Sequence, residues 1–300
     1  MKPIAIKKVL TTLFTSVLAI SLAFALVACG GTADNQNSKG NQGTNGNQNA
    51  NGNSGSRDQS KLVVGATTAP HAEILNALKA DLAAEGYELQ VIEYTDYVKP
   101  NLDTHSGVIL ANFFQHQPYL DEFNSAQGTK LVSVVAVHFE PLAIYPGKVK
   151  SLAALPDGAT IAVPNDTTNE ARALQLLQAQ GLITLPAGAD LTVTPRDIVS
   201  NPKNLKFAEL EAASIPAQLA TVDLGVINGN FALSAGLDTT TILAAEDANS
   251  QAAQTYANVL VVNRGDENLP GIQALKKALT SEKTRQFINN TYKGVVIPVF

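Results

Sequence analysis

Between residues 61 and 300, short apolar runs alternate with stretches in which apolar side chains recur at helical spacing. Residues 61–65 form an apolar run, and residues 74–82 then show the periodicity of one buried helix face, with Pro70 in the first turn. The same pattern predicts strands at residues 88–94, 108–114 and 131–137, a short polar helix at 99–105 and a helix from Pro118 to Gly128. This alternation predicts a mostly parallel sheet with right-handed crossovers.

A similar series of elements follows. The pattern predicts strands at 160–164, 205–210 and 223–228, a helix at 171–180 that Gly181 ends, and a final strand and helix between 256 and 292. Residues 139–145 are predicted to be extended and lie between the two series of elements, so we expect them to cross between two units, with a return near residues 231–241. The predicted fold class is α/β, with two lobes joined by two crossing segments and a ligand cleft between the lobes.

The N-terminus has the pattern of a secretory leader. Lys2, Lys7 and Lys8 precede an uncharged stretch at residues 9–28, which ends in Leu-Val-Ala followed by Cys29, the only cysteine of the chain. A permanent membrane span is the alternative, since about 20 apolar residues can cross a bilayer. The Leu-Val-Ala-Cys segment resembles the bacterial lipobox, which implies cleavage before Cys29 and acylation of its thiol.

Residues 30–60 contain no large apolar side chain but eight Asn and seven Gly. Such a segment cannot bury enough apolar area to offset its loss of conformational entropy, so we expect a disordered tether. The predicted organisation is a signal peptide at 1–28, the acylated cysteine and tether at 29–60, lobe 1 at 61–140 plus 241–300, and lobe 2 at 141–240.

Charge and motifs narrow the function. The chain has 26 acidic and 21 basic residues, and loss of the three leader lysines leaves 18 basic residues and a net charge of −8. An acidic chain of this kind argues against a nucleic-acid partner. No Gly-x-Ser-x-Gly, His-Glu-x-x-His or Gly-rich phosphate loop occurs, and Cys29 is expected to be acylated. We therefore expect no enzyme activity and no cofactor.

Three histidines lie near predicted strand ends: His71, His116 and His138. Three imidazoles can hold a zinc ion when they converge. Each, however, stands alone in its segment, without the paired spacing of known zinc motifs. A lone histidine is more often a hydrogen-bonding residue, so no metal site is predicted.

Residues suited to a pocket occur at or after the carboxyl ends of four predicted strands, where open α/β sheets bind ligands. They lie in segments 96–98, 112–116, 165–172 and 226–228. Arg172 is placed in the first turn of an otherwise apolar helix, a setting that suits a carboxylate. An ordinary surface arginine is the alternative on this segment alone.

Several segments together resemble one family. These segments are residues 67–75, Asp96-Tyr97-Val98, Phe114-Gln115-His116, Val163-Pro164-Asn165-Asp166, residues 201–205, residues 209–212 and Val226-Ile227-Asn228. With the lipobox, they resemble the NlpA-type lipoproteins, the methionine-binding proteins of ABC importers. The resemblance covers residues 61–300 and implies a type II periplasmic-binding-protein fold, a membrane permease as partner, and a lipid-anchored position outside the cytoplasm.

The resemblance also implies a ligand site. Arg172 would bind the ligand carboxylate, and Asn169 and Asn228 would fix the carboxylate and the ammonium. The side chain of methionine would be enclosed by Tyr97, Phe114 and His116. If Arg172 acts on the ligand alone, its removal leaves the stability of the ligand-free protein nearly unchanged.

The chain departs from the family pattern after Asn228. A Thr-Thr-Tyr-Ala pattern is usual there, whereas this chain has Gly229-Asn230-Phe231-Ala232. The hydroxyl missing at Phe231 bears on the rim of the pocket or on the hinge. The resemblance implies L-methionine as the ligand, with D-methionine or a methionine-containing peptide as alternatives. Beyond these, a binding lipoprotein for a metal ion or another amino acid, and a surface adhesin or interaction lipoprotein, remain as competing functions.

Overall fold

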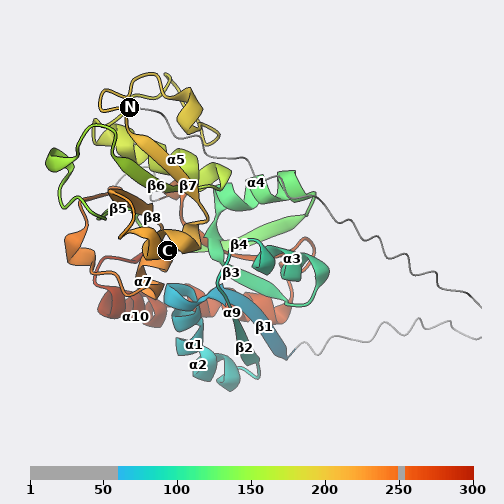
Figure 1. Cartoon of the computed structure of the whole chain (residues 1–300). Helices are drawn as coiled ribbons and strands as arrows, with labels where there is room; N and C mark the ends of the chain where they lie inside the picture. Colours follow the sequence, from blue (N-terminus) through green and yellow to red (C-terminus); the bar gives the residue numbers. More distant parts are fainter. Residues whose placement is uncertain (1–59, 249–253) are drawn as a thin grey trace, which may run out of the picture. The chain divides into compact units, whose positions relative to one another are not determined.

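The computed structural model describes residues 60–248 and 254–300 (Figure 1). The predicted leader, Cys29 and the predicted tether up to residue 59 lie outside the described residues. Within the described ranges, no helix combines the length and the apolar character needed to cross a bilayer.

Six strands form the first sheet, in the order β11-β4-β10-β3-β1-β2. The strands are β1 (Lys61–Thr67), β2 (Glu88–Tyr94), β3 (Ala111–His116), β4 (Leu131–Phe139), β10 (Asn258–Asn263) and β11 (Ile297–Pro298). The helical segments that belong to this part of the chain are η1 (Thr68–Ala72), α1 (Glu73–Ala77), α2 (Lys79–Ala84), α3 (Lys99–Ser106), α4 (Gln117–Gln127), α9 (Pro270–Leu279) and α10 (Glu282–Tyr292).

The core of this first lobe forms where helices cover the sheet. Leu62 and Val64 of β1 pack with Ile74 and Leu75 of α1, and Ile272 of α9 joins the same cluster. All five side chains are almost fully buried. Burial of each such side chain stabilises the fold by roughly 1.5–3 kcal/mol relative to exposure.

Five strands form the second sheet, in the order β7-β6-β8-β5-β9. The strands are β5 (Ala143–Pro146), β6 (Thr160–Pro164), β7 (Lys206–Leu210), β8 (Leu224–Ile227) and β9 (Ala244–Ala245). The helical segments here are η2 (Leu152–Ala154), α5 (Thr167–Ala179), η3 (Pro195–Asp197), η4 (Ala212–Ser214), α6 (Ile215–Gln218), α7 (Gly229–Ser234) and η5 (Thr239–Thr241). Leu174 and Leu177 of α5 pack with Ile161 and Val163 of β6 in a second core.

The two sheets confirm the α/β class and the division into two lobes, but the prediction of a mostly parallel sheet is wrong. β1 pairs in parallel with β2 and β3, and β6 pairs in parallel with β7 and β8. β10 runs antiparallel to β3 and β4, and β5 runs antiparallel to β8 and β9. β11 also runs antiparallel to β4. β5 and β10 are each entered from the other lobe, so the rule for helical crossovers within one sheet does not apply to them.

The return between the lobes also differs from the prediction. The first crossing follows β4 and leads into β5, as expected. Residues 231–234, predicted to begin the return, belong to α7 (Gly229–Ser234), and Ala245 of β9 still pairs with Ala143 of β5. The chain therefore re-enters the first sheet only at β10, and residues 241–245, placed in lobe 1 from the sequence, lie with the second sheet.

Helix α5 begins four residues before the predicted start. Asp166 is its N-cap, and its side chain accepts a hydrogen bond from the backbone N–H of Asn169 at 3.0 Å. This cap satisfies one of the free donors of the first turn. Arg172 consequently lies in the second turn of α5 and not in the first, so the proximity to a helix N-terminus argued from the sequence is wrong.

Candidate functional site

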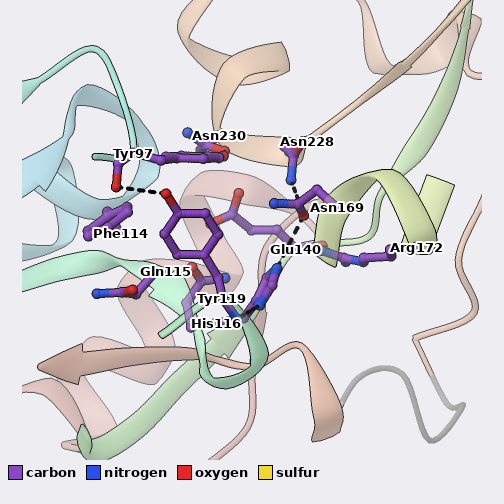
Figure 2. A pocket seen from close by; sticks show the side chains of 12 residues that line it. Tyr97, Phe114, Gln115, His116, Tyr119, Glu140, Asn169, Arg172, Asn228 and Asn230 are labelled. Atoms are coloured by element: carbon purple, nitrogen blue, oxygen red, sulfur yellow. Dashed lines mark hydrogen bonds between the residues drawn. The ribbon is translucent and has the colours of Figure 1, made fainter. Parts of the chain in front are cut away.

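A pocket of about 330 Å³ lies between residues of the two sheets (Figure 2). The residues that line it are Tyr97, Phe114, Gln115, His116, Tyr119, Glu140, Asn169, Arg172, Asn228, Gly229, Asn230 and Asn258. All six ligand-binding residues expected from the sequence are in this set. The lining combines aromatic side chains with a few polar groups, as in sites for small molecules.

An aromatic cluster forms one wall of the pocket. The ring of Tyr97 lies 5.6 Å from that of Phe114, 5.7 Å from that of Tyr119 and 4.7 Å from that of Phe231, measured between centroids. Phe231 belongs to α7 of the second lobe, so its contact with Tyr97 joins the two lobes. The hydroxyl of Tyr97 also donates to Oδ1 of Asn230 on the same helix.

His116 connects the end of β3 to α5. Its Nδ1 accepts from the backbone N–H of Tyr119 at 3.1 Å, which leaves Nε2 protonated to donate to Oδ1 of Asn169 at 3.2 Å. Asn169 Oδ1 also accepts from Nδ2 of Asn228 at 2.9 Å. Burial and the nearby Arg172 lower the pKa of His116 to about 3, so the imidazole is neutral.

Two buried amide atoms in the pocket have no hydrogen-bond partner among the described residues: Oδ1 of Asn228 and Nδ2 of Asn230. Both side chains are buried. A buried polar atom without a partner costs roughly 1–3 kcal/mol, so such atoms are expected to meet a ligand or water. The pocket thus offers one free acceptor and one free donor to a polar molecule.

Arg172 lies at the edge of the pocket and is buried. Its Nε donates to Oε1 of Glu246 at 2.7 Å, and Nη2 donates to Oε2 of Glu246 and to the backbone oxygen of Glu140 at 2.9 Å. The guanidinium also stacks 4.2 Å from the centroid of the Tyr256 ring. Figure 2 shows Arg172 on the opposite side of the pocket from Tyr97 and Phe114. The alternative of a surface arginine is therefore wrong.

The contact with Glu246 was not foreseen from the sequence. Glu246 follows β9, and its Oε2 also accepts from the backbone N–H of Leu142 in the first crossing at 2.8 Å. The ion pair uses Nε and Nη2 of the guanidinium, and the second N–H of Nη2 donates to the backbone oxygen of Glu140. Within the described residues these hydrogen bonds involve Nε and Nη2, so Nη1 is the nitrogen that can donate to a second anion.

A second unforeseen group is Glu140, which lies in the first crossing and is buried against the pocket. Nε2 of His138 donates to its Oε1 at 2.7 Å, Nε2 of His71 lies 3.4 Å from the same oxygen, and the backbone N–H of Asn230 also bonds to the carboxylate. Burial raises the pKa of Glu140, while burial lowers the pKa of His71 to about 4 and that of His138 to about 3. Both imidazoles are neutral at physiological pH.

Each of the three histidines stands alone in its sequence segment, but two of them meet in the fold. His71 and His138 meet at Glu140, with ring centroids 4.9 Å apart, whereas His116 faces Asn169. His71, His138 and Glu140 offer ligand atoms within 4.8 Å of one another. Their atoms already form a hydrogen-bond network, because Nδ1 of His71 lies 2.7 Å from Oγ1 of Thr67 and its Nε2 bonds to Asn258.

The sequence contains weak features that point to two of the residues not predicted for the pocket, Glu140 and Asn230. Glu140 is a charged residue inside an otherwise apolar crossing segment, which is unusual for a side chain without a role. Asn230 lies directly beyond the predicted Val226-Ile227-Asn228 segment. Glu246 lies in a segment without any recognisable pattern, and only the fold brings it to Arg172.

Comparison with known proteins identifies the family. The sequence pattern of the NlpA lipoprotein family matches residues 62–300. This chain belongs to the NlpA lipoprotein family. Among its NlpA relatives, the membrane lipoprotein TpN32 of Treponema pallidum is 42% identical over 77% of this chain and 85% of its own length. The methionine-binding lipoprotein MetQ of Bacillus subtilis is 35% identical over 96% of this chain and 98% of its own.

A solved structure extends the comparison. A nutrient-binding protein from Burkholderia cenocepacia, bound to methionine, is 43% identical and superposes with a TM-score of 0.75 over 80% of this chain and 100% of its own. The NlpA chain described here therefore has the two-lobe periplasmic-binding-protein fold. Two of these relatives, MetQ of Bacillus subtilis and the protein from Burkholderia cenocepacia, are named as binding proteins.

Proposed function

We propose that this NlpA protein is the extracytoplasmic binding component of an ABC importer and that it binds L-methionine and delivers it to a membrane permease. The observation that carries this proposal is the composition of the pocket. An amino acid with a thioether side chain needs a cation for its carboxylate, acceptors for its ammonium and an apolar enclosure. The relatives named for methionine support this choice of ligand.

The six residues expected from the sequence have complementary roles in this proposal. Nη1 of the Arg172 guanidinium donates to the ligand carboxylate, and the amides of Asn169 and Asn228 fix the polar end of the ligand. Tyr97, Phe114 and His116 enclose the side chain, with sulfur against aromatic edges. Arg172 lies at one end of the pocket and the aromatic wall at the other, so the carboxylate and the side chain of the ligand would occupy opposite ends (Figure 2).

The proposal includes the way in which the protein is held at the membrane. Cleavage before Cys29 and acylation of its thiol would anchor the mature chain on the extracytoplasmic side. Residues 30–60 would then span on the order of 30 Å as a Gly-rich coil, enough to let the binding lobes reach a permease in the same membrane.

Isothermal titration tests the proposed ligand. The protein is first unfolded and refolded to remove bound molecules, and L-methionine, D-methionine and glycyl-methionine are then titrated. We expect L-methionine to bind most tightly and to raise the melting temperature, because a ligand at 100 times its dissociation constant adds about 2.7 kcal/mol. Absence of any effect at millimolar methionine, together with a zinc-induced shift that EDTA reverses, would favour a metal-binding function instead.

Substitution of Arg172 tests its proposed role. Arg172→Ala is expected to weaken methionine binding by about two orders of magnitude or more, since loss of one partner of a buried charge pair costs roughly 2–5 kcal/mol. Arg172→Lys should restore only part of the affinity, because an ammonium cannot reproduce the planar fork of the guanidinium. An affinity of the alanine variant within threefold of the original would place Arg172 outside the ligand site.

A further inference from the structure

Asp166 makes more hydrogen bonds than a helix cap needs. Its Oδ1 accepts from the backbone N–H of Asn169 at 3.0 Å, and this contact caps α5. The side-chain Nδ2 of Asn169 also donates to the carboxylate, to Oδ1 at 2.9 Å and to Oδ2 at 3.1 Å. A serine would satisfy the backbone N–H as well as an aspartate does. Capping therefore leaves the contacts with the Asn169 side chain unexplained.

These contacts fix the direction of the Asn169 amide. A carboxylate oxygen accepts hydrogen bonds, so Asp166 selects the NH2 end of the amide. Oδ1 of Asn169 then lies on the other side, where it accepts from Nε2 of His116 at 3.2 Å and from Nδ2 of Asn228 at 2.9 Å (Figure 2). His116 favours the same orientation, because its Nδ1 accepts from a backbone N–H and its proton is on Nε2. Asn169 is thus held at both ends of its amide.

The orientation of Asn169 determines that of Asn228. Nδ2 of Asn228 donates to Asn169, which leaves Oδ1 of Asn228 buried without a partner among the described residues. If the Asn169 amide turned over, its NH2 group would face the NH2 group of Asn228. Asn228 would then have to turn as well, and it would present a donor to the pocket instead of an acceptor. The polarity of the pocket at Asn228 therefore depends on the residue that holds Asn169.

Asp166 makes these contacts from outside the pocket lining. Its half-buried side chain lies instead in a neighbouring cavity, which Tyr97 and Glu211 also line. Burial raises the pKa of Asp166, and the hydrogen bonds from Asn169 and Thr168 lower it. Oδ1 accepts from both the backbone and the side chain of Asn169, so one acceptor oxygen is sufficient. The contact is therefore available whether or not the carboxyl group is protonated.

We infer that Asp166 is a positioning residue of the ligand site, which holds Asn169 and, through Asn169, sets the orientation of Asn228. The inference rests on the proposed binding of methionine and adds a residue that acts without touching the ligand. It distinguishes two roles of one side chain, the cap of α5 and the contact with the Asn169 amide. A substitution that keeps the cap but loses the amide contact should therefore weaken binding.

Two substitutions separate these roles. Asp166→Ser keeps a hydroxyl for the backbone N–H of Asn169, but its shorter side chain cannot also hold Nδ2. Asp166→Asn keeps both the cap and an acceptor oxygen for Nδ2. Methionine is titrated into the refolded full-length protein and its variants. We expect binding to be about tenfold weaker in Asp166→Ser, because two amides must then be ordered on binding, and within threefold of the original in Asp166→Asn.

Another capping aspartate provides the matched control. The exposed Asp238 is the N-cap of η5, and its Oδ1 accepts from the backbone N–H of Thr240 at 2.9 Å. Asp238→Ser makes the same chemical change at a cap that has no contact with Asn169. We expect its affinity for methionine to lie within twofold of that of the original protein.

A double-mutant cycle identifies the residue through which Asp166 acts. Asn169→Ala removes the amide but leaves the backbone N–H that Asp166 caps. Asp166→Ser should weaken binding about tenfold in the original chain and less than twofold in the Asn169→Ala chain. A role in capping alone predicts the same loss in both chains, because the N-terminus of α5 is capped in both. That result would overturn the positioning role.

The outcomes distinguish the inference from the proposed function. If the original protein does not bind methionine, the proposed function fails. If it binds methionine and Asp166→Ser binds within twofold of it, the proposed function stands and the inference is overturned. Equal losses in Asp166→Ser and Asp166→Asn also overturn it, since the asparagine keeps the acceptor oxygen. If Asp166→Ser does not fold, Asp166→Gly replaces it in the same cycle, because glycine is also tolerated at an N-cap.

Discussion

Replacement of Arg172 by alanine is predicted to destabilise the protein even without ligand. The guanidinium is bound at two positions by Glu246, donates to the backbone oxygen of Glu140 and stacks on Tyr256. Side-chain exposure is only 4% for Arg172 and 9% for Glu246. The variant would leave a carboxylate buried without its cation, so the expectation from sequence that stability would be nearly unchanged no longer holds.

The size of the effect follows from this burial. Removal of one partner of a buried ion pair costs about 3–5 kcal/mol, because the remaining charge keeps its desolvation penalty. For a domain of this size each kcal/mol lowers the melting temperature by about 2–4 °C. We therefore expect Arg172→Ala to melt roughly 6–20 °C below the original protein.

Calorimetry on refolded, ligand-free protein measures this shift, and a double variant gives the internal control. Arg172→Met with Glu246→Leu removes both charges and fills the space with apolar groups, so it should recover most of the lost stability. The exposed Arg196→Ala should melt within 2 °C of the original, since an isolated surface residue contributes little. A shift below about 3 °C for Arg172→Ala, or a double variant less stable than either single one, would refute the reasoning.

Three further predictions rest on other parts of the chain. Gly147→Ala should destabilise the fold by several kcal/mol, because the alanine Cβ would lie 2.7 Å from the backbone oxygen of Leu219 and 2.9 Å from that of Asp223. Urea titration measures this loss, and a variant as stable as the original would contradict the prediction. Burial, together with the nearby carboxylates of Glu209 and Asp166, raises the pKa of Glu170 to about 7. The folded protein therefore keeps this proton to a higher pH than the unfolded chain does, and ionisation of Glu170 disfavours folding as the pH rises from about 4.5 to 7. Glu170→Gln should therefore be more stable than the original by about 1 kcal/mol at pH 8, where solvent screens part of the penalty, and the gain should disappear below pH 4.5 in melts across this range. Mass spectrometry of membrane-extracted protein should find a diacylated Cys29 as the N-terminus, and an intact Met1 would exclude the lipid anchor.

Local signals in the sequence were enough for many elements. Helix α4 begins at Gln117, one residue before Pro118, and Gly128 ends it in the left-handed conformation, because these two residues favour those positions on their own. The apolar run at residues 131–137 likewise predicted β4 from local sequence alone. The start of α5 was missed because Thr-Thr-Asn resembles a loop, and only the Asp166 cap shows that these residues begin the helix.

Contacts between distant segments could not be derived from local pattern. α7 was interpreted as part of a crossing strand, yet its residues pack against η1 of the first lobe, and that contact favours a helix over an extended segment. The six expected site residues do line one pocket, because they follow strand ends. The contacts of Glu140 with α7 and of Arg172 with Glu246 were missed, since each joins segments that lie far apart in the sequence and meet only in the folded chain.

The stacking of Tyr97 on Phe231 has a consequence for how binding strength is set. The contact joins the lobes without involving a ligand, so it determines what fraction of molecules has the binding-competent arrangement beforehand. Apparent affinity equals intrinsic affinity multiplied by that fraction. Aromatic pairs are worth about 0.5–1.5 kcal/mol, so exchange of the Phe231 ring, which does not line the pocket, would tune the apparent dissociation constant about two- to tenfold while the residues that line the pocket stay the same. The ligand concentration that half-saturates such a protein is then adjustable through a residue outside its binding pocket.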